Sequence, residues 1–138
     1  MQLRSALATW VRFMRVSTKM ARAETQVLRT LGMSSAHFDV LVQIWQREGL
    51  TQQELSQRLL VTKGNVCYLV DKLEAEHLLE RRREGKTNRL FLTAKGRTFV
   101  EDTLPIHDRM IETVFSVLTP EELGTLRALL RKLDKALP

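Results

Sequence analysis

Residues 51–92 read TQQELSQRLLVTKGNVCYLVDKLEAEHLLERRREGKTNRLFL, and this stretch decides the fold. It opens on Thr51-Gln52-Gln53-Glu54, a Thr-x-x-Glu spacing in which the two outer side chains cap the first turn of a helix. After a tight connection, Thr62 is placed to cap a second helix, whose apolar residues recur at helical spacing: Val66, Leu69, Val70 and Leu73. The stretch therefore predicts two short helices joined by a tight turn.

Two short strands are predicted directly after these helices, at residues 78–83 and 89–92. Residues 84–88 between them are polar and include Gly85 and Asn88, which are residue types typical of turns. The segment thus predicts a β-hairpin. With the two helices before it, the stretch indicates a helix-turn-helix followed by a two-stranded wing.

A further helix is predicted immediately before this stretch. Ser34 can cap its first turn, and Gly49 is placed to end it in the left-handed conformation common at helix termini. Its inward face is expected to consist of Phe38, Leu41, Val42 and Trp45.

The two ends of the chain are predicted to form long helices with apolar faces. Residues 3–31 carry two adjacent apolar rows, and helical signals run from Thr93 to about residue 117, with Pro105 expected to kink or split that segment. Thr119-Pro120-Glu121-Glu122 is a strong helix start, followed by a leucine stripe of Leu123, Leu126, Leu130, Leu133 and Leu137. These faces lack an evident partner within the chain and predict an intertwined homodimer.

Composition and charge narrow the class of protein. The 138 residues predict one domain, with net charge +6 and basic residues concentrated in residues 1–31 and 77–100. This charge favours a polyanionic partner. The single cysteine, Cys67, excludes an internal disulfide, and the absence of a long apolar run or signal peptide predicts a cytoplasmic protein without a membrane segment.

No chemistry-bearing motif predicts an enzyme. The sequence has no nucleophile elbow or phosphate-binding loop, and its three histidines are too widely spaced to suggest a metal site. We therefore expect neither catalysis, nor a cofactor, nor a metal.

Double-stranded DNA is the partner that the central stretch predicts. The outward face of the second helix offers an amide, a phenol and an ammonium for base edges or phosphates, and the wing carries five cations within nine residues. The predicted DNA contacts are Thr51 and Gln52 at the first cap, Thr62, Lys63, Gly64, Asn65, Tyr68 and Lys72 on the recognition helix, and Arg82, Lys86 and Arg89 on the wing. Dimerisation would place two recognition helices about one DNA turn, roughly 34 Å, apart.

Residues 54–96 resemble the core of the MarR family of winged-helix regulators. The shared marks are Glu54-Leu55, the run from Leu69 to Glu74, the run Leu78-Leu79-Glu80-Arg81, and the run Leu92-Thr93-Ala94-Lys95-Gly96. The resemblance implies a homodimer that reads a pseudo-palindromic operator. It also implies a repressor of a nearby operon, released by a small, often phenolic, molecule or by oxidation.

The chain departs from the family pattern at two positions. Glu84-Gly85-Lys86 stands where the family commonly has Asp-x-Arg, and Lys cannot reproduce the planar fork of Arg. His77 stands where the family usually has Gly after the recognition helix, and histidine tolerates positive φ better than most residues.

The predicted organisation is a single domain over residues 1–138, mostly α with a small β-hairpin wing. Residues 34–100 form the winged helix-turn-helix core, and residues 1–31 and 104–138 form the dimerisation helices. Arg15, Lys19 and His37 are candidate contacts for an anionic aromatic effector, although solvent-exposed charges are the preferred interpretation of the first two. Cys67 is interpreted as a small packing residue rather than a redox sensor. The alternative functions are a protein-interaction module and an architectural nucleoid module.

Overall fold

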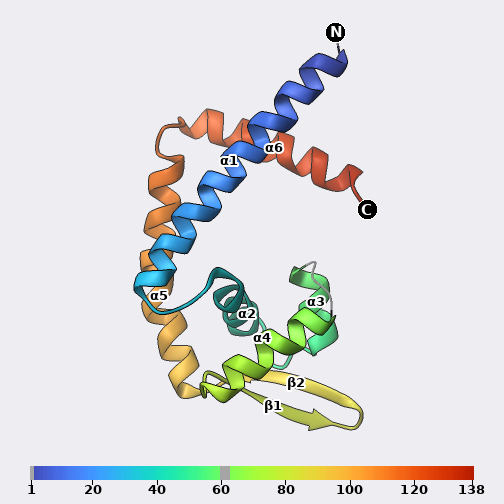
Figure 1. The fold of residues 1–138 in the computed structure, drawn as a ribbon, viewed down its shortest axis with the longest axis vertical. Helices are drawn as coiled ribbons and strands as arrows, with labels where there is room; N and C mark the ends of the chain where they lie inside the picture. Colours follow the sequence, from blue (N-terminus) through green and yellow to red (C-terminus); the bar gives the residue numbers. More distant parts are fainter. Residues whose placement is uncertain (1, 60–62) are drawn as a thin grey trace.

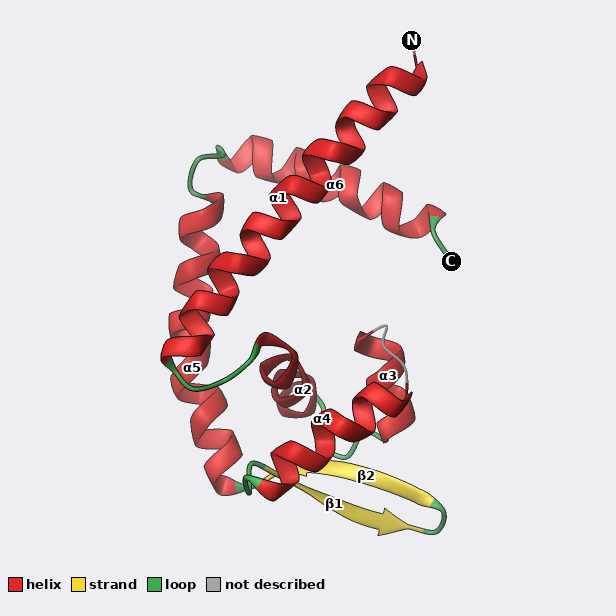
Figure 2. Cartoon of the chain, viewed as in Figure 1, coloured by secondary structure: helices red, strands yellow, loops and turns green. Residues whose placement is uncertain are grey.

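The computed structural model describes residues 2–59 and 63–138 and is mostly helical, with one antiparallel hairpin (Figures 1 and 2). The elements in order are α1 (Gln2–Thr30), α2 (Ser35–Gln46), α3 (Gln52–Leu59), α4 (Lys63–Ala75), β1 (Leu79–Glu84), β2 (Thr87–Leu92), α5 (Ala94–Phe115) and α6 (Pro120–Ala136). This order confirms the predicted fold class. None of the helices within the described ranges combines the length and the hydropathy that a membrane crossing requires.

The elements form two parts that we call the head and the arm. The head consists of α2, α3, α4 and the hairpin, and the arm consists of α1, α5 and α6 (Figure 1). The α5 helix runs from the hairpin to α6 and packs against both α1 and α2, so it joins the two parts. The N-terminus lies at the end of the molecule opposite the hairpin, and the C-terminus follows the free end of α6 (Figure 1).

The hydrophobic core belongs to the head. Leu41 and Ile44 of α2, Leu73 of α4 and Leu90 of β2 are completely buried in one cluster that also includes Val100 of α5. The arm is different, because α6 has no buried residue and α1 leaves large apolar side chains exposed. These exposed residues include Leu3, Leu7, Trp10, Phe13, Leu130, Leu133 and Leu137.

The α2 helix departs from its prediction in two details. It ends at Gln46 rather than at Gly49, which instead takes φ +86° in the following loop and donates its backbone N–H to the carbonyl of Leu90 at 2.8 Å. The conformation of Gly49 therefore serves this long-range bond within the chain and not the cap of α2. Trp45 is 36% exposed, because Val40 and Ile44 occupy the inward positions.

The hairpin is longer and its turn tighter than predicted. Leu79 pairs with Leu92 and Glu84 pairs with Thr87, which leaves only Gly85 and Lys86 in the turn. Gly85 has φ +63°, as the two-residue turns of β-hairpins require. The wing therefore presents Lys86 at its tip.

Two positions singled out in the sequence, Pro105 and His77, lie within or directly after a helix. Pro105 does not split α5, which continues from Ala94 to Phe115 because packing on α1 and α2 compensates for the lost backbone bond. His77 adopts φ +61° after α4, and its N–H and that of Leu78 bond back to the helix carbonyls of Glu74 and Leu73. Histidine thus performs the role that glycine usually has at this position.

Candidate nucleic-acid interface

The start of α3 is fixed by the predicted capping box. The backbone N–H of Glu54 donates to the Thr51 hydroxyl at 3.0 Å, and the Glu54 carboxylate accepts from the backbone N–H of Thr51 at 3.4 Å. This second bond is the main reason that the pKa of Glu54 is lowered. Thr51 also forms a β-bridge with Arg89, so the start of α3 is joined to the wing.

The α4 helix presents the predicted polar face to solvent. Val66, Leu69, Val70 and Leu73 are buried, while Asn65, Tyr68 and Lys72 are exposed on the opposite side, Tyr68 by 64%. Lys63 and Gly64 begin the helix, and Thr62 lies outside the described residues. The exposed face therefore agrees with the helical periodicity from which it was predicted.

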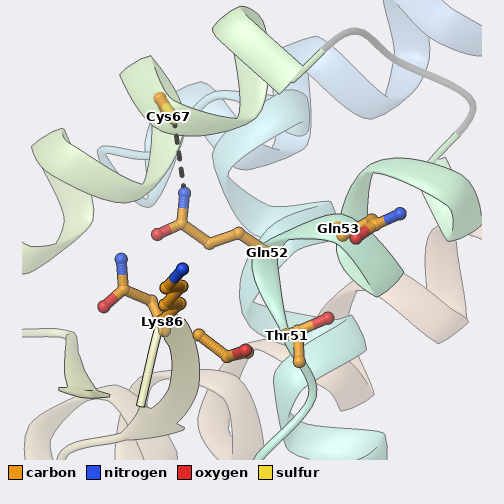
Figure 3. Close-up of a pocket in the computed structure, with 7 residues that line it drawn as sticks. Thr51, Gln52, Gln53, Cys67 and Lys86 are labelled. Carbon is orange, nitrogen blue, oxygen red and sulfur yellow. Dashed lines mark hydrogen bonds between the residues drawn. The ribbon is translucent and has the colours of Figure 1, made fainter. Parts of the chain in front are cut away.

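A cleft of about 360 Å³ separates the helix-turn-helix from the wing tip (Figure 3). In it, the Gln52 side chain extends from α3 toward α4 and donates from Nε2 to Cys67 Sγ at 3.4 Å. Lys86 approaches from the wing. The lining residues are Thr51, Gln52, Gln53, Cys67, Lys86, Thr87 and Asn88. Sequence reasoning missed Gln53, Cys67, Thr87 and Asn88 as cleft residues, because only the folded wing brings the turn next to α3 and α4.

Most of the wing arginines have partners within the chain. Arg82 lies over the Phe91 ring, 4.0 Å from its centroid, and pairs with Glu80 at 2.7 Å. Arg89 pairs with Glu84 and donates from Nη1 to the Gly49 carbonyl at 3.0 Å. Arg82 thus makes its contacts within the hairpin, whereas Arg89 also joins the hairpin to the loop after α2. The predicted contact of both residues with DNA stays a prediction.

The same holds for Arg81, which pairs with Asp71 and Glu74 of α4 and so fastens the wing to that helix. Arg83 donates to the Gly85 carbonyl at 3.1 Å. Within the described part of the chain, Arg83 and Lys86 are the wing cations that make no ion pair with a carboxylate. The uncompensated charge of the wing therefore lies toward its tip.

The three candidate effector contacts do not share one cavity. Arg15 and Lys19 are exposed on α1 and line a hollow with Met14, Thr18 and Arg22. Lys19 also lines an apolar hollow of about 370 Å³ between α1, α5 and α6.

His37 is instead buried in the first turn of α2, beside the Ser34 hydroxyl. Burial, and secondarily the charge of Lys72, lower its pKa and favour the neutral ring. Its Nε2 has no hydrogen-bond partner among the described residues.

The sequence matches known regulators over most of its length. Residues 31–89 match the model of the MarR family. An uncharacterized HTH-type transcriptional regulator of Bacillus cereus is 32% identical over 127 residues, covering 91% of this chain and 86% of the relative. The transcriptional repressor MprA of Escherichia coli is 28% identical over 125 residues, covering 87% of this chain and 71% of MprA.

Solved structures of two DNA complexes are similar to this chain. The Staphylococcus aureus MepR–DNA complex gives a TM-score of 0.85 at 27% identity, covering 92% of this chain and 96% of MepR. A mutant of E. coli MarR complexed with operator DNA gives a TM-score of 0.86 at 25% identity, covering 97% of this chain and 96% of the MarR chain. Structures of the same two proteins described without DNA give lower TM-scores, 0.70 for MepR and 0.73 for the MarR mutant, and cover 91% and 88% of this chain.

The helix-turn-helix, the wing and the long terminal helices occur together in this chain, and its relative from Bacillus cereus is an HTH-type transcriptional regulator. The chain belongs to the MarR family of helix-turn-helix transcriptional regulators.

Proposed function

We propose that the chain is a homodimeric repressor that binds a pseudo-palindromic operator in double-stranded DNA. The observation that carries the proposal is the polar face of α4, where Asn65 and Tyr68 are exposed beside a cleft that Lys86 of the wing lines. Asparagine can bond adenine edges in the major groove, and a lysine at a projecting tip can reach phosphates or a minor groove.

The homodimer is supported by the arm. The apolar residues of α1 and α6 are exposed in the single chain to an extent that a second copy would relieve, as with Trp10, which is 64% exposed. We propose residues 1–31 and 104–138 as the dimerisation helices and residues 34–100 as the DNA-binding core. The two recognition helices then meet DNA about one helical turn apart.

Repression is supported by the relative MprA, which is a transcriptional repressor. A small anionic aromatic molecule is the effector class that we propose, because Lys19 lies at an apolar hollow that includes Phe115 and Leu126. A cation beside an apolar surface suits an aromatic acid or phenolate.

The proposed DNA contacts are those predicted above, with two distinct roles. Asn65 reads bases, so Asn65→Ala weakens operator binding by about 1–3 kcal/mol and relaxes base preference at one position. Lys86 neutralises phosphate, so Lys86→Ala weakens all sequences alike and lowers the slope of log affinity against log salt by about one. Lys135→Ala is the matched control, because it also removes one lysine but lies in the last turn of α6, away from the wing (Figure 1).

The experiment begins with selection of bound fragments from the source genome near physiological salt, about 0.15 M. We expect an enriched inverted repeat with half-sites about one turn apart. Binding without an enriched motif would instead indicate an architectural protein, and no binding would indicate a protein-interaction module. Equal losses for the Asn65 and Lys86 variants on selected and random duplexes would refute the division of roles.

A further inference from the structure

One side of α1 carries a row of exposed cations. At about 100° per residue these cations lie within an arc of about 100°, and at about 1.5 Å per residue the row is about 38 Å long. We call this surface the cationic face of α1. It consists of Arg4, Arg12, Arg15, Lys19, Arg22 and Arg29, all of them exposed.

The cationic face points away from α5. The opposite side of α1 carries Glu24, the only carboxylate of this helix, whose Oε2 lies 2.8 Å from Nε2 of His107 on α5. Leu28, on the same side as Glu24, is completely buried. In Figure 1, α1 crosses in front of α5 and α6, and none of the described elements lies over its outer side in this view.

The cationic face is also separate from the apolar surface that a second copy would cover. Leu3, Leu7 and Trp10 are exposed on α1, and the centre of this group lies about 120° around the helix from the centre of the cations. A homodimer that buries these apolar side chains can therefore leave the cations in solvent.

The charge of this face is not neutralised within the chain. Among the described residues, none of its six cations forms an ion pair with a carboxylate. The wing differs, because Arg81, Arg82 and Arg89 all have carboxylate partners there. More unpaired positive charge thus lies on α1 than on the wing.

The spacing of the charges favours a nucleic acid over an acidic protein. Successive cations from Arg12 to Arg22 are about 4.5–6 Å apart along the helix axis, whereas duplex DNA has one phosphate charge per about 1.7 Å. Each cation therefore meets a phosphate in any register, while a folded protein would need a matching row of carboxylates. Five of the six cations are arginines, whose planar guanidinium group matches phosphate oxygens in a bidentate contact.

The residues between the cations favour DNA over an anionic membrane. Helices that bind to a bilayer surface insert large apolar side chains in the same contact. On this face the intervening residues include Ser5, Thr18 and Gln26, which are polar and exposed, whereas Leu3 and Trp10 lie on another side.

We propose that the cationic face of α1 is a second, sequence-independent binding surface for the phosphate backbone of duplex DNA. The inference goes beyond the proposed binding of an operator by the head and does not depend on it. The bound groups are phosphates, so the contact carries no base preference and weakens steeply with salt.

This surface and the wing can hold different segments of DNA. The α1 helix leads from the head toward the N-terminus, which lies at the end of the molecule opposite the hairpin (Figure 1). Duplex DNA is stiff, with a persistence length of about 150 base pairs. A duplex held by α4 and the wing therefore does not bend back to the N-terminal half of α1, and the cationic face is left for a second segment.

The experiment measures protection of a single thiol placed in the cationic face. Thr18 is exposed among the cations, so Thr18→Cys in a Cys67→Ser background puts the only thiol of the chain on this face. Its reaction with N-ethylmaleimide is followed at about 0.05 M salt, where phosphate contacts are strong, with increasing amounts of a random-sequence duplex. We expect saturating duplex to slow the reaction about tenfold, because only free protein reacts.

Charge variants in this background test whether the cations cause the protection. Arg12→Gln/Arg15→Gln/Arg22→Gln should lower the slope of log affinity against log salt by about three, one for each lost phosphate contact. The matched control is Arg127→Gln/Arg131→Gln/Lys135→Gln, which removes the same charge from exposed positions of α6. The control should keep the parent slope, and an equal fall in it would overturn the assignment to α1.

Other outcomes also decide the proposal. A thiol at position 18 that is unreactive without DNA would show that a second copy covers this face, and would overturn the proposal. Protection by phosphatidylglycerol vesicles or by polyglutamate that equals or exceeds protection by the duplex would overturn the assignment to DNA. No protection by the duplex would leave the face as solvated surface and would refute the inference.

The parent protein tests the head in the same assay. Its single thiol, Cys67, is exposed on α4 and reports duplex bound at the proposed recognition helix. Protection at position 18 without protection at Cys67 would refute the proposed DNA contact of the head and leave this inference standing. The reverse pattern would refute this inference alone.

Discussion

Gly96→Ala tests whether the contact between α5 and the base of the wing is as close as the structure has it. A Cβ built on Gly96 would lie 1.9 Å from the Leu78 carbonyl oxygen and 2.9 Å from its carbon. Real Cβ contacts are essentially never shorter than 3.0 Å, so α5 or the strand must move by about an ångström. The same Leu78 oxygen accepts a hydrogen bond from the backbone N–H of Thr93. Thr93 in turn caps α5, because its hydroxyl accepts from the backbone N–H of Gly96 at 3.0 Å.

Three effects change the free energy of unfolding. Overpacking typically lowers it by about 1–3 kcal/mol, and disturbing the Thr93 cap lowers it by about 1 kcal/mol more. The better helix propensity of alanine raises it by up to about 1 kcal/mol. Gly96→Ala should therefore lower the free energy of unfolding by about 1–3 kcal/mol.

Urea denaturation at one fixed protomer concentration measures this loss, because unfolding of a dimer depends on concentration. Gly124→Ala is the matched control: it also lies within a helix, but nothing lies within 4 Å of the added Cβ in the described chain. In the single chain the added methyl group of the control meets no neighbour, and the helix propensity of alanine adds up to about 1 kcal/mol. A loss of stability in the control would therefore report a contact of α6 in the proposed dimer. A Gly96→Ala protein within about 0.5 kcal/mol of the parent, which is the usual range for surface substitutions, would refute the close contact.

Three further predictions concern single side chains. Alkylation of Cys67 with N-ethylmaleimide should weaken DNA binding, because the thiol is exposed and lines the cleft; Cys67→Ser should be insensitive to the reagent in the same gel-shift titration. The pKa of His37 is lowered in the folded chain, so its contribution to folding stability is fully present above the usual imidazole pKa of 6.5 and is lost as the pH falls below that value. The melting temperature of His37→Gln should therefore fall less steeply toward pH 5 than that of the parent, and an equal dependence on pH would contradict this assignment. Asp39 has a pKa of about 6 in the folded chain against 3.8 in the unfolded one, so its favourable contribution to folding stability is lost as the pH rises through about 6. Asp39→Asn should therefore melt at a higher temperature than the parent at pH 7.5, and a lower melting temperature would count against this.

Local sequence signals predicted the helix starts well. Ser34, Thr51 and Thr119 each accept a hydrogen bond from a backbone N–H in the first turn of their helix, as their spacing to the following residues indicated. Such caps involve groups only three residues apart, so no distant part of the chain is needed to form them. The buried face of α4 was predictable for the same reason, since 3.6-residue periodicity is a local property.

Features that depend on distant contacts were predicted poorly. Gly49 was expected to end α2, but its conformation serves a bond to Leu90, a residue 41 positions away. Trp45 was expected inside, yet the hairpin and α5 complete the core without it. The cleft residues, and the contact between Glu24 of α1 and His107 of α5, likewise join separate elements. The periodicity of the sequence carries no information on contacts between distant elements.

The internal ion pairs of the wing have a consequence for how a regulator finds its site in a genome. Arg81, Arg82 and Arg89 already have carboxylate partners, so they displace fewer counterions from DNA than their number suggests. Unrelated DNA binds through that electrostatic term, whereas the operator is also held through base contacts. A wing of this kind shortens the time spent on competing sequences, and fewer copies of the protein per cell then suffice to keep one operator occupied.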